Sequence, residues 1–145
     1  MSVDGWSLIR FLHVLAAMVF VGGQLVLSGM VLPIVRKDLE PERSGPLARK
    51  TARLFGHTAN IVLLPTLIVT GLALMSHRGI GWVGLGEEGY GRLLSIKLGM
   101  VVLSVALLAT HGIIAMRNPA KAKPFAVAGL TASVLIVVFA TALVP

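Results

Sequence analysis

The chain has 145 residues, of which 56% are hydrophobic and 13% charged, and its mean hydropathy is +0.89. This composition excludes a soluble globular domain and is typical of an integral membrane protein. The net charge of +7 would suggest nucleic-acid binding in a polar chain. Here most Lys and Arg residues flank long apolar runs, so we expect contact with lipid headgroups and no nucleic-acid partner. The absence of cysteine excludes disulfides and thiolate metal sites.

Four apolar runs are long enough to cross a bilayer, which takes about 20 helical residues. The first lacks a basic leader and is too long for a signal peptide, so we expect it to stay as a transmembrane helix. Short links predict an all-α, antiparallel, up-down-up-down four-helix transmembrane bundle, forming one domain over residues 1–145. The predicted helices cover residues 6–34, 48–76, 91–116 and 124–144.

Proline and glycine mark the expected helix ends and links. The first helix is predicted to end at Pro33 or soon after, where a charged connection begins, and Pro65 predicts a kink in the second helix. The glycine-rich link before the third helix is expected to be a flexible cap. Its Trp82 and Tyr90 fit the interfacial aromatic belt.

The basic residues predict the orientation. Nine lie on the side of the first and third links and four on the opposite side, which places the first side in the cytoplasm and both termini outside the plasma (inner) membrane. The nine are Arg36, Lys37, Arg43, Arg49, Lys50, Arg53, Arg117, Lys121 and Lys123; the four are Arg10, Arg78, Arg92 and Lys97.

The third helix carries two ionisable groups on one stripe. Lys97, Val101, Ser104, Leu108 and His111 follow one another by steps of four and three, so they share a helix face. Ionisable groups are costly inside a bilayer, so each is a site hypothesis and should have a partner on another helix.

His57 and His111 are predicted to lie at one depth. Each is nineteen residues from an outer marker, Ser76 or Arg92, which is roughly 28 Å of helix. Two imidazoles facing each other from antiparallel helices suit the axial positions of a haem iron. In the alternative reading, His57 bonds Asn60 or a backbone carbonyl, and His111 caps polar groups near the interface.

His13 and Lys97 form a second predicted pair at the outer side, three residues from Arg10 and five from Arg92 respectively. A lysine near a helix end often snorkels to the surface. To bind a metal it would have to be neutral, a state that burial favours. His77 is most simply a solvated end residue, and it is a spare ligand candidate on the His13 side.

Other residues describe the faces around these groups. Small residues on the fourth helix favour close packing, which would close the bundle. The first helix continues the His13 stripe, and the second is expected to continue the His57 face. The residues are Gly129, Ser133 and Ala140 on the fourth helix, Ala17, Phe20 and Gln24 on the first, and Asn60, Leu64 and Gly71 on the second.

Three segments resemble known families. The run FLHVLAAMVFVGGQLVLSGMVLP, residues 11–33, resembles the first helix of the copper-resistance D (CopD-like) membrane domain. IKLGMVVLSVALLATHG, residues 96–112, together with RLFGHTANIVLLPTLIVTGLALM, residues 53–75, is similar to the HemJ type of protoporphyrinogen oxidase, a small four-helix haem-associated protein. That resemblance implies a haem b site at His13 and Lys97.

Three hypotheses follow. The first is a haem b-binding membrane redox protein with one or two haems, held by His57 with His111 and by His13 with Lys97. It would exchange electrons with a quinol, a small oxidant or a porphyrinogen, so an oxidoreductase activity is left open. The second is a copper transport or resistance component. The third is a structural subunit of a membrane complex; a homo-oligomer is compatible with all three.

Overall fold

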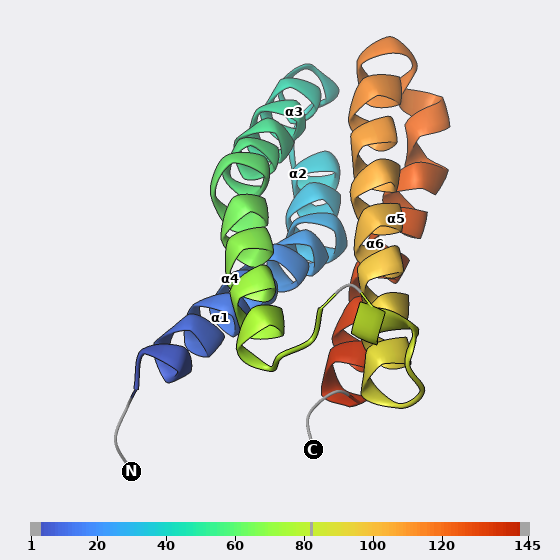
Figure 1. Cartoon of the computed structure of the whole chain (residues 1–145). Helices are drawn as coiled ribbons and strands as arrows, with labels where there is room; N and C mark the ends of the chain where they lie inside the picture. The colour runs from blue at the N-terminus through green and yellow to red at the C-terminus, as the bar shows by residue number, and fades with distance from the viewer. Residues whose placement is uncertain (1–3, 82, 143–145) are drawn as a thin grey trace. The chain divides into compact units, whose positions relative to one another are not determined.

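The computed structural model describes residues 4–81 and 83–142, with the side chains of residues 116, 119, 120 and 142 excepted. Within these residues the fold is all-α, and four long helices are apolar enough to cross a membrane (Figure 1). The all-α four-helix membrane class is therefore confirmed, and the chain is a multi-pass membrane protein. The four spans are Gly5–Asp38, Pro41–His77, Tyr90–Ala115 and Lys121–Thr141.

The chain divides into two compact units, Met1–Gly79 and Ile80–Pro145. Each unit is an antiparallel pair of long helices, and each is described by itself. The single domain expected over residues 1–145 stays a prediction.

The first unit consists of two long helices, each interrupted by a short π-helix. One helix runs through α1, η1 and α2, and the other through α3, η2 and α4. α1 packs against α4 and α2 against α3, so the two long helices are antiparallel. The segments are α1 (Gly5–Val26), η1 (Leu27–Val31), α2 (Leu32–Asp38), α3 (Pro41–Thr58), η2 (Ala59–Leu63) and α4 (Leu64–His77).

Each π-helix ends two residues before a proline, η1 before Pro33 and η2 before Pro65. The residue that precedes Pro33 or Pro65, which is Leu32 or Leu64, donates its N–H to the carbonyl five residues earlier. Proline has no N–H, and its ring clashes with the carbonyl four residues back. The wider π turn accommodates that ring without ending the helix.

Two predicted boundaries in the first unit are wrong, each because of a proline. The first long helix does not end near Pro33 but continues to Asp38. The second begins at Pro41 instead of residue 48, because proline is well suited to the first helical position. The charged connection is thus largely helical, and only Leu39 and Glu40 lie between the two helices.

The second unit consists of η3 (Val83–Gly86), α5 (Tyr90–Arg117) and α6 (Pro119–Ala142). α5 and α6 pack closely because Gly129 leaves room for the Leu108 side chain: a Cβ on Gly129 would lie 3.0 Å from Leu108 Cδ2. Nearby, the buried hydroxyls of Ser104 and Ser133 are hydrogen-bonded at 2.8 Å. The packing role predicted for Gly129 and Ser133 is confirmed, while Ala140 is half-buried.

The glycine-rich link is tied to the start of α5. Ser95 donates its hydroxyl to the carbonyl of Leu85 at 2.5 Å, and Gly91 packs against the Gly84 carbonyl so closely that a Cβ would overlap it. Gly89 has a φ of +85°, a conformation that favours glycine. The predicted interfacial position of Trp82 falls outside the described residues.

Candidate functional site

His13 is held against the opposite helix of the first unit. It is half-buried on α1, and its Nδ1 lies 2.8 Å from Oγ1 of Thr70 on α4. The Thr70 hydroxyl donates to the carbonyl of Thr66 at 2.5 Å, and a hydroxyl has one hydrogen to give. The Thr70 oxygen therefore accepts from His13, so Nδ1 carries the proton and the neutral ring has its lone pair on Nε2.

A glycine makes this close approach of ring and helix feasible. A Cβ placed on Gly71 would lie 3.2 Å from Cε1 and 3.7 Å from Nδ1 of His13. Any larger residue would press on the ring. Gly71 and Thr70, adjacent on α4, thus fix the position and the tautomer of one imidazole together.

His111 has the same tautomer in the second unit. Its Nδ1 lies 2.9 Å from the carbonyl oxygen of Ala122 on α6. A carbonyl can only accept, so Nδ1 is the donor, and Nε2 has the lone pair in the neutral ring. An imidazole whose Nδ1–H is bound to an oxygen is the usual state of a metal-ligating histidine. The donor chemistry of His13 and His111 therefore fits iron ligation through Nε2.

His57 and Lys97 are positioned differently. His57 is exposed on α3, and Lys97 is half-buried on α5. Each predicted pair takes one residue from each unit, so the pairing of His57 with His111 and of Lys97 with His13 stays a prediction.

The face expected around His57 is not continuous. Asn60 is exposed, whereas Gly71 contacts His13 on the opposite helix. The reason is the π-helix η2, which lies between His57 and Gly71. A π-helix has more residues per turn than the 3.6 of an α-helix, so it rotates the following face. Faces counted by α-helical spacing across this segment are therefore wrong.

Gln24 is a buried polar residue on the stripe that the sequence predicts to continue from His13. Its side chain is 8% exposed, and Oε1 has no hydrogen-bond partner among the described residues. It lies eleven residues from His13 on the same face of α1, together with buried Phe20. The signal available in the sequence was an amide within an otherwise apolar stripe.

His77 stacks on Trp6, with the ring centroids 3.8 Å apart and the planes at 15°. It is exposed, as expected of an end residue, and it links the last turn of α4 to the first turn of α1. No group of three or more His, Asp or Glu side chains within the described residues lies close enough to share a metal ion.

Comparison of the chain with protein-family models, with curated proteins and with solved structures gives no match. The similarities to the CopD-like domain and to the HemJ type are therefore interpretations of the motifs quoted above.

Proposed function

We propose that the protein is a haem b-binding membrane redox protein in which His13 and His111 ligate iron through Nε2. The observation that carries this proposal is shared by the two residues: in each, the Nδ1–H donates to an oxygen on the neighbouring helix, Thr70 Oγ1 or the Ala122 carbonyl. From the spacing in the sequence, Lys97 would hold the haem together with His13, and His57 would do so together with His111.

The protein side chains hold the ligands and shape the surroundings. Hydrogen bonding at Nδ1 orients an imidazole and raises the basicity of Nε2, so Thr70 and the Ala122 carbonyl strengthen both ligands. A bound haem supplies one-electron chemistry between ferric and ferrous iron. The proposed electron donor is a quinol, which loses two electrons and two protons to become a quinone. A porphyrinogen is the alternative electron donor. The proposed electron acceptor is a small oxidant.

The proposed location is the plasma (inner) membrane, with both termini on the outer side. Nine basic residues on the side of the first and third links against four on the other support this orientation. Cysteine labelling of single-site variants near Asp4 and Arg49, with a reagent that does not cross membranes, would test it. Labelling of a cysteine near Arg49 in intact cells would show that this region is outside, which is the opposite of the proposed orientation.

The absorption spectrum of the detergent-purified protein, with and without dithionite, tests the cofactor. A Soret band and sharp reduced peaks support the proposal, and the haem-to-chain ratio gives one or two haems. A colourless protein that binds Cu(I) would support the copper alternative. A colourless protein that binds neither would support a structural subunit.

Single substitutions then test the ligands. His57→Ala and His111→Ala are each expected to remove one haem, and His13→Ala to remove the other where two are present. His77→Ala is the matched control, because this histidine stacks on Trp6 and is not one of the proposed ligands. Unchanged haem content in both the His57 and His111 variants would refute their pairing.

A further inference from the structure

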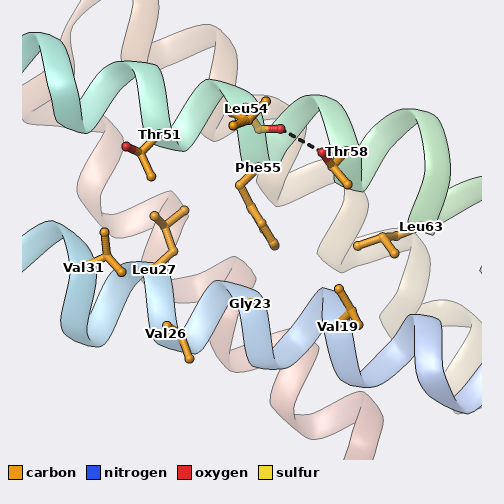
Figure 2. Close-up of a pocket in the computed structure, with 10 residues that line it drawn as sticks. All are labelled: Val19, Gly23, Val26, Leu27, Val31, Thr51, Leu54, Phe55, Thr58 and Leu63. Atoms are coloured by element: carbon orange, nitrogen blue, oxygen red, sulfur yellow. Dashed lines mark hydrogen bonds between the residues drawn. The ribbon is translucent and has the colours of Figure 1, made fainter.

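An apolar groove runs between the two long helices of the first unit, with a cavity volume of about 330 Å³. Figure 2 shows that one wall comes from α1 and η1 and the other from α3 and η2. Val19 lies opposite Leu63 at one end, and Val31 lies opposite Thr51 at the other (Figure 2). The remaining lining residues are Gly23, Val26, Leu27, Leu54, Phe55 and Thr58.

The groove lining offers only hydrocarbon to a ligand. Its two polar side chains, Thr51 and Thr58, donate their hydroxyls to carbonyls of their own helix, at 3.0 Å and 3.2 Å. A quinone ring would place its carbonyl oxygens there without a donor, which is unfavourable in an apolar site. An unbranched aliphatic chain has no polar group to satisfy and gains from burial.

The length of the groove matches one lipid leaflet. Val19 to Val31 and Thr51 to Leu63 each span twelve residues, which is roughly 18 Å of helix. The hydrocarbon core of a bilayer is about 30 Å thick, so a single leaflet contributes about 15 Å. One acyl chain lying along the groove, past the Phe55 ring that packs against Gly23 between the two ends, would therefore extend from the headgroup region to the middle of the membrane.

Positive charge gathers at the Thr51 end. Arg49, Lys50 and Arg53 are within two residues of Thr51 on α3 and are all exposed. Lys50 is on the Leu54 side of the helix, whereas Arg49 and Arg53 are about 200° around the helix from Thr51. Between residues 44 and 58 there is no Asp or Glu to offset them. Cationic side chains at this level attract the phosphates of anionic lipids, each by a similar increment.

We propose that the groove binds one acyl chain of an anionic phospholipid, with the lipid phosphate beside Arg49, Lys50 and Arg53. The apolar lining selects the chain, and the charge at the Thr51 end selects the headgroup. The site requires no haem and is independent of the proposed redox function.

Native mass spectrometry of the purified full chain tests the site, with dioleoyl phosphatidylglycerol and dioleoyl phosphatidylcholine as probes. The wild type is expected to bind one phosphatidylglycerol more tightly than phosphatidylcholine. Val19→Trp fills the inner end of the groove and is expected to weaken phosphatidylglycerol binding by about tenfold. Val14→Trp is the control. Val19 and Val14 both lie on α1 and are similarly exposed, at 45% and 49% respectively, but Val14 does not line the groove.

A second variant tests the headgroup without changing helix packing. Replacing Arg49, Lys50 and Arg53 together by Gln is expected to weaken phosphatidylglycerol binding by at least about tenfold and to leave phosphatidylcholine binding unchanged. Arg117, Lys121 and Lys123 are exposed as well, and replacing them by Gln removes the same charge elsewhere and should have little effect.

Three results would overturn the proposal. Equal phosphatidylglycerol affinity of the Val19→Trp and Val14→Trp variants would show that the groove does not hold the chain. Equal binding of the two lipids by the wild type would remove the role of charge. A wild-type dimer that dissociates in the Val19→Trp variant, with lipid binding retained, would assign the groove to a second copy of the chain.

Discussion

Nδ1 of His13 lies 2.8 Å from the hydroxyl oxygen of Thr70, which is on the opposite long helix of the first unit. This bond joins α1 to α4 and fixes the tautomer of an imidazole proposed as a haem ligand. Because Thr70 donates to the Thr66 carbonyl, it can only accept from the ring. The relationship is thus directional, and it can be removed without altering the ring itself.

Thr70→Val should weaken haem binding about 10–100-fold and shift the haem reduction potential, because an orienting partner of the ligand is lost. Haem titration followed by the Soret band, with a redox titration, measures both. Thr66→Val is the matched control on the same helix, since the Thr66 hydroxyl donates to Val62 within its own helix. Equal effects of the two substitutions would contradict a positioning role for Thr70.

Gly23 and Gly22 are adjacent but differ in their surroundings. A Cβ on Gly23 would overlap the Phe55 ring, whereas a Cβ on Gly22 would meet no described atom within 4 Å. Gly23→Ala should therefore lower the free energy of unfolding by about 1–3 kcal/mol through overpacking. Gly22→Ala should be neutral or stabilising by up to about 1 kcal/mol, because alanine favours the helix.

Unfolding in detergent, followed by circular dichroism, measures both glycine variants. The atoms that a Cβ on Gly23 would overlap belong to the ring at the end of the Phe55 side chain. Rotation of that ring away from α1 would reduce the cost of Gly23→Ala. A Gly23→Ala protein as stable as Gly22→Ala would show that the contact between α1 and α3 tolerates such movement.

The sequence predicted much of the fold because apolar length and small residues are local signals. Four spans are present where four were expected, and Gly129 and Ser133 pack as predicted. The π-helices before Pro33 and Pro65 were not predictable by α-helical spacing, which is why the Gly71 face was misplaced.

The site was less accessible to sequence reasoning. His13 and His111 stand out as ionisable residues in apolar helices, but their partners do not. The Thr70 hydroxyl and the Ala122 carbonyl become partners only through the packing of a neighbouring helix. Every residue type has a backbone carbonyl, so the sequence does not indicate which carbonyl His111 bonds. The tautomer of His111 could therefore be assigned only from the structure.

Ser104 and Ser133 should be energetically coupled within the second unit, because their buried hydroxyls bond to each other. Ser104→Ala alone is expected to cost about 0.5–1.5 kcal/mol of unfolding free energy. The double variant, Ser104→Ala with Ser133→Ala, should cost less than the sum of the two single variants. Thr131→Ala is the control, since the exposed Thr131 hydroxyl bonds its own helix. Strict additivity in the double-mutant cycle would show that the serines do not stabilise each other.

Asp4 should make the first turn of α1 sensitive to acid. Its carboxylate accepts from the hydroxyl and the N–H of Ser7 at 2.6 Å and 2.7 Å, and these bonds hold the pKa of Asp4 below its usual value. A folded-state pKa below the unfolded value of about 3.9 means that the stabilisation is fully present above that pH. It is lost as the pH falls through the folded-state pKa, when the protonated carboxyl becomes a weaker acceptor for the helix N-terminus.

Amide exchange at Ser7, measured by NMR in micelles and corrected for intrinsic rates, is expected to lose protection only in that acidic range. Asp4→Asn provides the control, because asparagine caps a helix about as well as aspartate but does not titrate. Its Ser7 amide should keep the same protection throughout the acid titration. If both proteins lose protection together, the acid sensitivity belongs to another group, and Asp4 acts only as a structural cap.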